Sequence, residues 1–475
     1  MSEEMKYLYG IWYSSHFLEP KREMNKTLPN ARSCISSSDQ HFFQISSEEI
    51  SKNCPNFTEI IYPITWLYIL GATTTFTALL YLIYKILKPI NWRKDLTAIG
   101  YDHLRGGLYK VKYARRARKV GETLPPPFPN GWFGILESKE LKAGEVKSVN
   151  CLGQNFAVMR TAKGEAAVLD AYCPHLGANM AIGGVVRDNC LECPFHQWRF
   201  SSETGQCSGV PYSVKGTVPK ASVKKWECRE VNGSIFVWHH VDPEITPWEI
   251  PSVPEVESGR WMYRGRNEFY INCHIQEIPE NGADIAHLNS VHGQNLFASN
   301  SQTSSSNFSL ISEILSNFIH TWNAVWEPRE DEDKTHRAVM NLQHALGIKG
   351  SKFRMFQMDV RAEQIGPGYV QLNISTSIGR MVILQTVTPV EPLVQKVVHR
   401  IYCPWYLIPY ASFVMLGECI MFERDIAIWN HKKYMNNPHF LREEKSIKRY
   451  RTWYQQFYSD QSKTFREATE ETLDW

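Results

Sequence analysis

The sequence has no strong excess of charge of either sign, few cysteines for its length and only one long apolar run. Its 475 residues include 52 Lys or Arg and 49 Asp or Glu, and the resulting net charge of +3 gives no indication of a nucleic-acid partner. Eleven cysteines are far below the density of a disulfide-stabilised scaffold. A mean hydropathy of −0.35 excludes a protein with many membrane spans. With 43% hydrophobic and 21% charged residues, the composition is typical of a packed globular chain.

Two common sequence signals are also lacking. The first fifteen residues are acidic and contain no basic stretch followed by an apolar one, so we expect neither a cleavable signal peptide nor a usual transit peptide. No G-x-G-x-x-G motif opens a predicted helix. Because that motif carries the phosphates of a dinucleotide, any NAD(P)H-dependent step is expected to need a separate protein.

The one long apolar run is Ile60–Tyr84, which has 25 residues without a charge. As a helix it would be about 37 Å long, enough to cross a hydrocarbon core of about 30 Å with some tilt. Tyr and Trp side chains lie towards both of its ends, where amphipathic rings favour the membrane interface. A buried core helix is the alternative, but 25 residues exceed the usual length of such runs, so we predict a single transmembrane helix.

The flanks of this run predict its orientation. Lys85–Lys119 holds eleven Lys or Arg against two acidic residues, whereas residues 1–59 hold six against eight. Basic flanks stay in the cytosol, so residues 1–59 are expected in the lumen and the rest of the chain after the helix on the cytosolic side, in the endoplasmic reticulum membrane. The sequons at Asn25 and Asn56 and a possible Cys34–Cys54 disulfide agree with this orientation.

Composition and turn signals divide the rest of the chain. A basic linker, residues 85–129, ends in the proline cluster Leu124–Pro129. Short β-rich runs separated by Gly and Asn follow, and after them come longer strand-like runs such as YVQLNIST together with helical segments. We therefore expect an α+β protein in five parts: residues 1–59, a helix over 60–84, the linker 85–129, an all-β domain over 130–245 and an antiparallel-sheet domain over 246–475.

The first metal-ligand motif is Cys173-Pro-His175, followed by Cys193-Pro-Phe-His196. Two cysteines and two histidines could bind structural zinc, but a zinc finger pairs cysteine with cysteine and histidine with histidine. Here each loop supplies one of each. Two thiolates on one iron and two imidazoles on the other make a Rieske [2Fe–2S] centre.

This motif closely resembles the Rieske family, which also has glycines at the positions of Gly177 and Gly183-Gly184. The respiratory members carry an extra disulfide, but Ala178 and Phe195 stand at its two positions here. The resemblance is therefore to the low-potential ferredoxin and oxygenase members. One departure is Gln197, where the oxygenase motif has glycine. The resemblance therefore does not specify the backbone geometry of the turn at this residue. Cys190 and Cys207 match no ligand position and are interpreted as structural.

A second motif has the form E-x3-D-x2-H-x4-H, with Glu280, Asp284, His287 and His292. Residues three or four apart share a helix face, so Glu280, Asp284 and His287 are expected to converge. Two imidazoles and one carboxylate suit a non-haem Fe(II) site with open positions. H-x4-H alone is weak, but beside a Rieske motif it resembles the mononuclear iron site of Rieske oxygenases. That resemblance implies a distant acidic ligand, for which we choose Asp425, with Glu423 as the alternative.

The resemblance also implies how electrons move. Asp284 matches the aspartate that links the iron site of one subunit to the Rieske histidine of its neighbour, which implies a homotrimer; the alternative role of Asp284 is a helix cap or a surface acid. The expected cofactors are a [2Fe–2S] cluster, a mononuclear Fe(II), and NADH or NADPH acting through a separate reductase. The apolar run Ile401–Gly417 leads into the predicted ligand helix and is interpreted as pocket wall, membrane-dipping surface or buried core.

One membrane span followed by CPHLGANM and CPFHQWRF resembles the Neverland-type cholesterol 7-desaturases of animals. The resemblance implies a helix-grip-like catalytic domain and a reaction in which O2 and cholesterol give 7-dehydrocholesterol in steroid hormone biosynthesis. A second candidate is another membrane-bound Rieske oxygenase that hydroxylates a steroid or acts on a chlorophyll-pathway pigment or a quaternary amine. A third is a membrane-bound Rieske electron carrier, which would need only the first motif. A carrier predicts two irons per chain and an oxygenase three.

Overall fold

The computed structural model describes residues 57–94, 124–214, 216–293, 318–348, 351–352 and 357–473. The sequons at Asn25 and Asn56 and the proposed Cys34–Cys54 pair lie outside these ranges, as does most of the predicted linker.

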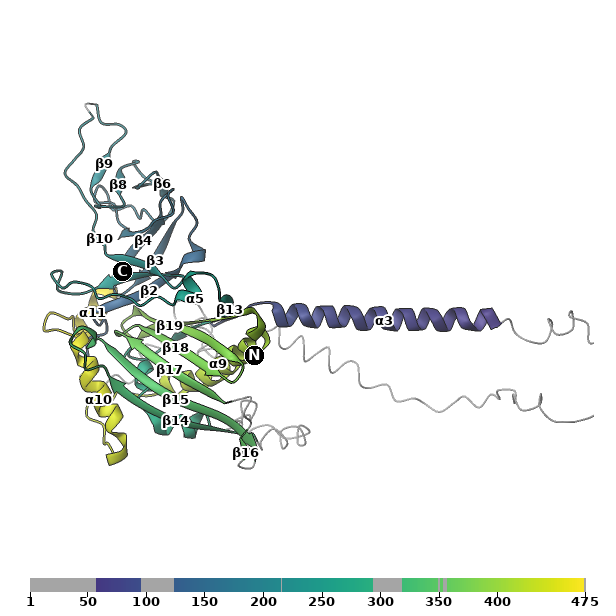
Figure 1. Cartoon of the computed structure of the whole chain (residues 1–475). Helices are drawn as coiled ribbons and strands as arrows, with labels where there is room; N and C mark the ends of the chain where they lie inside the picture. The colour runs from purple at the N-terminus through teal and green to yellow at the C-terminus, as the bar shows by residue number, and fades with distance from the viewer. Residues whose placement is uncertain are drawn as a thin grey trace, which may run out of the picture. The chain divides into compact units, whose positions relative to one another are not determined.

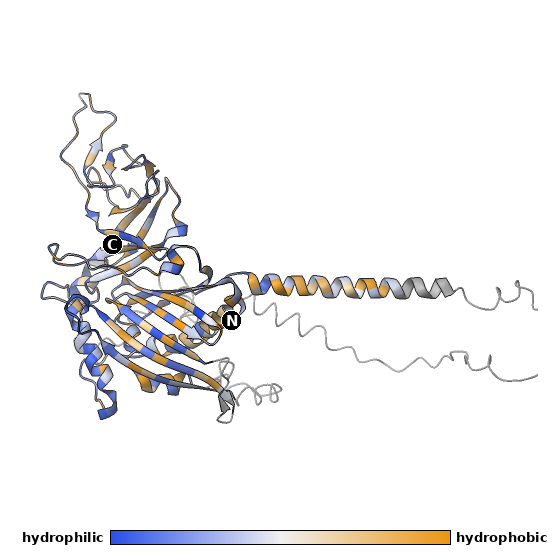
Figure 2. Cartoon of the chain, in the orientation of Figure 1, coloured by the Kyte–Doolittle hydropathy of each residue, from blue (hydrophilic) through white to orange (hydrophobic). Residues whose placement is uncertain are grey.

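The predicted apolar helix is present as α3 (Phe57–Leu87; Figure 1) and is longer than the uncharged run that predicts it. Hydrophobic residues recur along its described length (Figure 2), and its Thr side chains donate to carbonyl oxygens three or four residues earlier. Within the described chain, two helical stretches are long and apolar enough to cross a membrane, Thr65–Lys85 and Trp405–Trp429. None of the first is buried inside the protein, whereas a third of the second is.

The first β-rich region consists of three small antiparallel sheets. One has the order β11-β12-β2, the second β10-β5-β4-β3 and the third β6-β7-β8-β9. Their strands are β2 (Gly131–Glu137), β3 (Val146–Cys151), β4 (Gln154–Arg160), β5 (Ala166–Asp170), β6 (Val185–Arg187), β7 (Cys190–Glu192), β8 (Arg199–Ser201), β9 (Cys207–Gly209), β10 (Lys225–Trp226), β11 (Cys228–Val231) and β12 (Ser234–His239). The third sheet is short and carries the second Cys-Pro loop between β7 and β8, so that this loop stands at the end of a hairpin.

The second region is built on one nine-stranded sheet of order β1-β13-β20-β19-β18-β17-β15-β14, with β16 paired to β15. Every pairing is antiparallel except that of β1 with β13. The strands are β1 (Ile90–Arg93), β13 (Met262–Ile271), β14 (Phe318–Pro328), β15 (Arg337–Ile348), β16 (Ser351–Lys352), β17 (Met358–Ile365), β18 (Tyr369–Thr376), β19 (Gly379–Glu391) and β20 (Val394–Cys403). Polar and apolar residues alternate along them (Figure 2), as expected for a sheet with two different faces.

Helix α9 (Ile408–Trp429) packs against this sheet. Its residues Ala411, Met415 and Cys419 join one buried cluster with Ile383 of β19 and Ile401 of β20. The other helices are short: α5 (Pro254–Glu257), α6 (Glu277–Glu280), α7 (Ile285–Val291), α10 (Lys445–Tyr454) and α11 (Phe465–Leu473). A helix on an antiparallel sheet agrees with the predicted α+β class.

The apolar run Ile401–Gly417 is the end of β20, a 3-10 turn and the first half of α9. Its inner face, with Leu407 and Met415, is buried core. Its outer face exposes Trp405, Tyr406 and Phe413. The buried-core interpretation therefore holds for one face of the run, and none of its residues lines the metal-site cavity described below.

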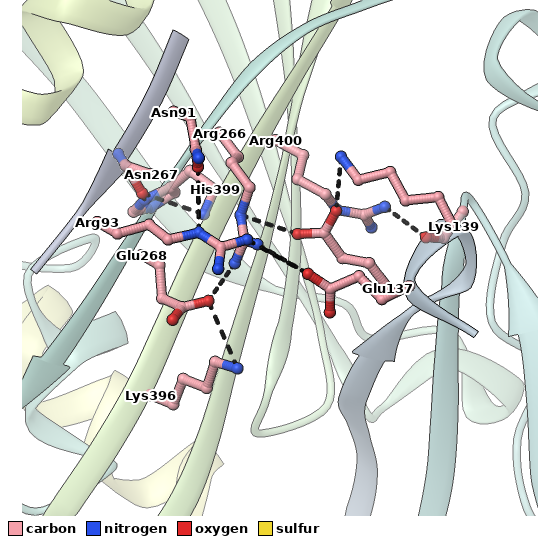
Figure 3. Close-up of polar contacts among 12 residues, drawn as sticks. Asn91, Arg93, Glu137, Lys139, Arg266, Asn267, Glu268, Lys396, His399 and Arg400 are labelled. Carbon is pink, nitrogen blue, oxygen red and sulfur yellow. Dashed lines mark hydrogen bonds and ion pairs between the residues drawn. The ribbon is translucent and has the colours of Figure 1, made fainter. Parts of the chain in front are cut away.

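Charged residues join the two β-rich regions (Figure 3). Arg266 of β13, which is 3% exposed, pairs with Glu137 of β2 at 2.9 Å and with Glu140 at 3.3 Å. Glu137 also forms an ion pair with Lys139 at 3.0 Å. Arg400 of β20 donates a hydrogen bond to the carbonyl oxygen of Gly233 at 2.7 Å. A buried arginine without partners would be costly, so these contacts favour one relative position of the two regions.

Two expectations about local structure are corrected. Ile90–Arg93, predicted as linker, is strand β1 and pairs in register with Gly265–Glu268 of β13. The helix expected over Glu280–His292 is two helices, because the chain turns at Asn281–Ala283 and Asp284 starts α7. As a result Glu280 does not converge on the metal site; it binds Arg451 of α10 through hydrogen bonds of 2.6 and 3.0 Å.

Candidate active site: two clusters of metal ligands

The two Cys-Pro loops have the same backbone geometry. In the first, the Cys173 N–H donates to the Ala178 carbonyl and the Gly177 N–H to the Cys173 carbonyl, both at 2.9 Å. In the second, the Cys193 N–H donates to the Trp198 carbonyl at 2.8 Å and the Gln197 N–H to the Cys193 carbonyl at 3.0 Å. The two turns are therefore equivalent, and each directs one cysteine and one histidine into the space between the two loops.

Gln197 occupies the position that Gly177 has in the first loop. Its φ is 58° and that of Gly177 is 74°, so both residues adopt the left-handed conformation. The turn therefore forms with glutamine, at a backbone cost of about 1 to 2 kcal/mol for a residue that has a Cβ.

The side chains of the two loops meet. The ring centroids of His175 and His196 are 4.7 Å apart, and Trp198 stacks on His175 at 4.5 Å. Cys173 and Cys193 are each only 2% exposed. Burial, with a further contribution from the Cys193 thiol, raises the pKa of Cys173 to about 11. Thiols with a raised pKa ionise only when a cationic centre stabilises the thiolate form. Two such thiols beside two imidazoles therefore fit a [2Fe–2S] cluster.

The second loop is also tied to its hairpin. Glu192, which precedes Cys193, pairs with Arg187 at 3.0 Å and with Arg199 at 2.9 Å. Trp198 donates to the Tyr212 hydroxyl at 2.7 Å. Cys190 and Cys207, interpreted as structural, lie in β7 and β9 of the same hairpin sheet, and the Cys207 side chain packs in the core beneath the loops.

The second cluster consists of His287, His292 and Asp425, whose ligand atoms all lie within 4.8 Å of one another. The two imidazole centroids are 5.4 Å apart, and His292 Nε2 lies 3.1 Å from Asp425 Oδ1. His292 Nδ1 is buried without a hydrogen-bond partner. Burial lowers the pKa of His287 and so favours the neutral ring that a metal requires. Two imidazoles and a carboxylate fit a mononuclear iron.

Asp284 starts the helix that carries both histidines. Its carboxylate accepts from the N–H groups of Ala286 and His287 at 3.1 and 3.2 Å, which makes it the N-cap of α7. Its carbonyl oxygen also bonds His287 Nδ1. Asp284 thus determines where α7 begins and which way the His287 ring faces.

Other contacts position α7 against the sheet and α9. Asn289 exchanges two 3.2 Å hydrogen bonds with the backbone of Trp322 in β14. The Trp322 indole donates to the His292 carbonyl at 3.2 Å, and Arg424 of α9 donates to the Val291 carbonyl at 3.3 Å. These contacts bring the end of α7 to the helix that supplies Asp425.

The structure distinguishes the two acidic candidates on α9. Asp425 faces the histidines and is 8% exposed. Glu423 instead accepts from the Trp92 indole at 2.8 Å and pairs with Lys94. Since residues two apart on a helix point in different directions, only Asp425 reaches the cluster.

A cavity opens at this cluster and is lined mainly by apolar side chains. Besides the three ligands, its wall includes Leu288, Trp322, Met340, Leu372, Met421 and Phe422. Its volume of about 190 Å³ is below that of most ligand pockets, so a bulky ligand requires side chains of the wall to move. The cavity combines a metal site with an apolar binding surface.

Comparison with known proteins agrees with this geometry. The Rieske [2Fe-2S] domain family matches residues 131–227, and the 3-ketosteroid 9alpha-hydroxylase C-terminal domain family matches residues 237–458. A cholesterol 7-desaturase of Bombyx mori is 43% identical over 417 residues, which cover 87% of this chain and 88% of that protein. The chain belongs to the cholesterol 7-desaturase family. A family member from Drosophila melanogaster is 45% identical, over 80% of this chain and 89% of its own.

Solved structures agree on the fold. NdmA of Pseudomonas putida, in a complex with caffeine, has a TM-score of 0.51 at 17% identity and covers 73% of this chain and 95% of its own. This member of the cholesterol 7-desaturase family is therefore an oxidoreductase of the Rieske oxygenase class, with a Rieske cluster and a mononuclear iron as its cofactors.

Several side chains at the site have no signal in the sequence. Trp322 and Asn289 position α7, while Glu418 and His399 line the cavity. None belongs to a spaced motif, and His399 comes from a strand with no predicted ligand. For Glu418 the sequence shows only that this charge directly follows the apolar run Ile401–Gly417, which does not indicate a role at the site.

Proposed function

We propose that the protein catalyses the O2- and NAD(P)H-dependent 7,8-dehydrogenation of cholesterol to 7-dehydrocholesterol. The observation that carries this proposal is the His287, His292 and Asp425 cluster at an apolar cavity, in a chain 40–45% identical to cholesterol 7-desaturases. A sterol is nearly all hydrocarbon, and such a ligand is recognised mainly by apolar side chains.

Each part of the site has a role in this reaction. Cys173, His175, Cys193 and His196 would hold the cluster, and His287, His292 and Asp425 the iron, which together supply electrons and activate O2. Apolar residues such as Trp322, Met340 and Phe422 bind the ring system and exclude water from it. Trp322 also holds α7 through the His292 carbonyl, so that the histidines keep their positions when a ligand binds.

Electron supply is proposed to involve other chains. A separate reductase passes electrons from NADH or NADPH, and Asp284 links the iron site to His175 or His196 of a neighbouring subunit in a homotrimer. The carboxylate of Asp284 is only partly buried, so it can accept a further hydrogen bond besides those that cap α7.

The tether is proposed to bring enzyme and substrate together. With α3 as a single span, residues 1–59 are lumenal and the two β-rich regions, 130–245 and 246–475, lie on the cytosolic side of the endoplasmic reticulum. Sterols partition into bilayers, so a tethered site meets its substrate at a high effective concentration.

A sterol conversion assay tests the proposal. The full chain is expressed in cultured cells with a competent reductase, labelled cholesterol is supplied, and 7-dehydrocholesterol is measured. We expect product from the wild type and none from His287→Ala. His431→Ala is the matched control, because this exposed histidine lies just beyond the end of α9 and its ring bonds the Ala427 carbonyl.

The iron content separates the alternatives. Three irons per chain without 7-dehydrocholesterol would favour a Rieske oxygenase with another lipid substrate. Two irons per chain in a fully loaded protein would favour the electron carrier.

A further inference from the structure

A row of polar side chains crosses the sheet beneath the cavity. Pairing registers place Gln364 of β17 beside Val370, Val370 beside Gln385 of β19, Gln385 beside His399 of β20, and His399 beside Asn267 of β13. We call Gln364, Gln385, His399 and Asn267 the polar row. Gln364, Gln385 and His399 line the cavity, and Asn267 lies directly behind His399.

The next row on the same face is apolar. Ala362 and Leu372 lie two residues along β17 and β18 from Gln364 and Val370. Ala362 pairs with Leu372 on one side and with Met340 of β15 on the other. All three line the cavity. The cavity therefore has an apolar floor with one polar band, an arrangement suited to a hydrocarbon that carries a single polar group.

The position of the protons on His399 follows from its neighbours. His399 Nδ1 lies 2.8 Å from Asn267 Oδ1, which also accepts from the His399 backbone N–H at 3.2 Å (Figure 3). An amide oxygen only accepts, so His399 Nδ1 carries the proton. Burial lowers the pKa of His399 to about 3. His399 Nε2 is therefore unprotonated and acts as an acceptor.

Glu418 of α9 faces that acceptor. Its Oε1 lies 3.6 Å from His399 Nε2, too far for a direct hydrogen bond, and its side chain is 23% exposed at the cavity wall. Burial, followed by the nearby Asp425 carboxylate, raises the pKa of Glu418 to about 7. The Gln385 amide, or Glu418 when its carboxyl group is protonated, therefore offers a donor beside an imidazole that accepts.

We propose that Glu418, His399 and Gln385 form a subsite that binds the hydroxyl group of the sterol. The hydroxyl donates to His399 Nε2 and accepts from the Glu418 carboxyl group or the Gln385 amide, so that both halves of its hydrogen-bonding capacity are used. This subsite rests on the proposed function and names which end of the substrate is recognised by polar groups.

The position of Glu418 on α9 agrees with this role. Glu418 and Asp425 are seven residues apart, two turns or about 10 Å along the helix, and both line the cavity. A sterol carries its hydroxyl on the first ring and the reacting C7 and C8 on the second. Binding the hydroxyl at Glu418 leaves the first ring between the subsite and the metal ligands and directs the second ring towards His287 and His292.

The test compares cholesterol with 5-cholestene, which has the same hydrocarbon without the hydroxyl. The full chain, loaded with both iron centres and supplied with reductase, is assayed for sterol affinity and kcat/KM. We expect the wild type to prefer cholesterol about ten- to a hundredfold, because the analogue leaves buried polar groups unpaired. Glu418→Leu should bring this ratio close to one mainly through KM, whereas Glu418→Gln should retain most of the preference.

Controls keep the outcome interpretable. Ile428→Leu changes an exposed neutral residue of the same helix that does not line the cavity, and its cholesterol preference should equal that of the wild type. Cluster absorbance and iron content report folding. Should Glu418→Leu fail to fold, Gln385→Leu is expected to lower the same ratio by a smaller factor.

The possible failures differ. If the wild type converts both compounds equally well, or if folded Glu418→Leu keeps the full preference, the hydroxyl subsite is wrong while the desaturase function stands. If loaded wild-type protein neither binds nor converts cholesterol, the proposed function fails and the subsite with it.

Discussion

His292 Nε2 and Asp425 Oδ1 lie 3.1 Å apart, although the seven strands β14–β20 separate the two residues in the sequence. His292 is the C-cap residue of α7, and Asp425 lies in α9. The contact exists because Arg424 of α9 bonds the end of α7 and because Trp322 holds the His292 backbone. Together with His287, whose ligand atom lies within 4.8 Å of theirs, these two residues can form a ligand set for iron.

Removing the carboxylate of Asp425 should remove one iron per chain. We expect Asp425→Ala to contain two irons instead of three, with the cluster spectrum unchanged, and to form no product. Glu423→Ala is the matched control on the same helix and should retain three irons, because Glu423 binds Trp92 and Lys94. Metal analysis with absorbance spectroscopy decides between them, and three irons in Asp425→Ala would refute the ligand role.

The cysteines of the first cluster can be tested in the same way. Cys173→Ser should lose the Rieske absorbance and its electron paramagnetic resonance signal. Cys207→Ser should keep both, since Cys207 packs under the loops and bonds the Gly209 carbonyl at 3.8 Å. A cluster lost in Cys207→Ser and kept in Cys173→Ser would reverse the two roles.

Replacing Gln197 by glycine should stabilise the protein. Its φ of 58° is strained for a residue with a Cβ, and the gain is partly offset by the greater freedom of glycine in the unfolded chain. The expected net gain is about 0.5 to 1 kcal/mol, seen as a higher Tm. Gln197→Ala retains the Cβ and should show no such gain; equal stabilisation by both variants would mean that backbone strain is not the cause.

The capping of α7 by Asp284 and the proposed link of Asp284 to a neighbouring subunit can be tested separately. Asn is as good an N-cap as Asp, so Asp284→Asn should preserve the stability of α7, whereas Asp284→Ala should cost about 1 kcal/mol. If the carboxylate also links neighbouring subunits, both variants should slow the transfer of electrons from the reduced cluster to the iron site. Rapid-mixing absorbance measures that rate. A wild-type rate in Asp284→Asn would leave Asp284 with the capping role alone.

The ion pair of Arg160 and Glu230 should make stability depend on pH. Arg160 donates to both carboxylate oxygens of Glu230 at 2.8 and 2.7 Å. Burial tends to raise the pKa of Glu230, but these bonds outweigh it and lower the pKa below the ordinary 4.5. A lowered folded pKa means stability that is fully present above about pH 4.5 and is lost as the pH falls through the folded pKa.

Glu230→Gln should therefore lower the free energy of unfolding by about 0.5 to 1 kcal/mol at pH 7, and the difference should shrink below pH 4.5. Thermal melts over this range measure it. Glu227→Gln is the control, because Glu227 pairs with Arg229 at a more exposed position, with a 40% exposed side chain. A Glu230→Gln effect independent of pH would argue against the ion pair as its source.

The sequence alone determined the chemistry of the ligands. The spacing of Cys173, His175, Cys193 and His196 specifies two loops that each offer one thiolate and one imidazole, and this pattern is local enough to be read without a fold. The same holds for His287 and His292, five residues apart. The turn at Gln197 was not predicted in this way, because glutamine stands where the motif has glycine; the structure shows that Gln197 adopts the left-handed conformation.

Only the tertiary structure decided the rest. Asp425 and Glu423 are equivalent by composition, and the packing of α9 against α7 and β1 determines which of them faces the histidines. Glu280 was expected at the site from helical periodicity, but the start of a new helix at Asp284 turned it towards Arg451. The polar row and Glu418 meet because strand register and helix packing bring together residues from β13, β19, β20 and α9. Such contacts join distant segments, and no local pattern records them.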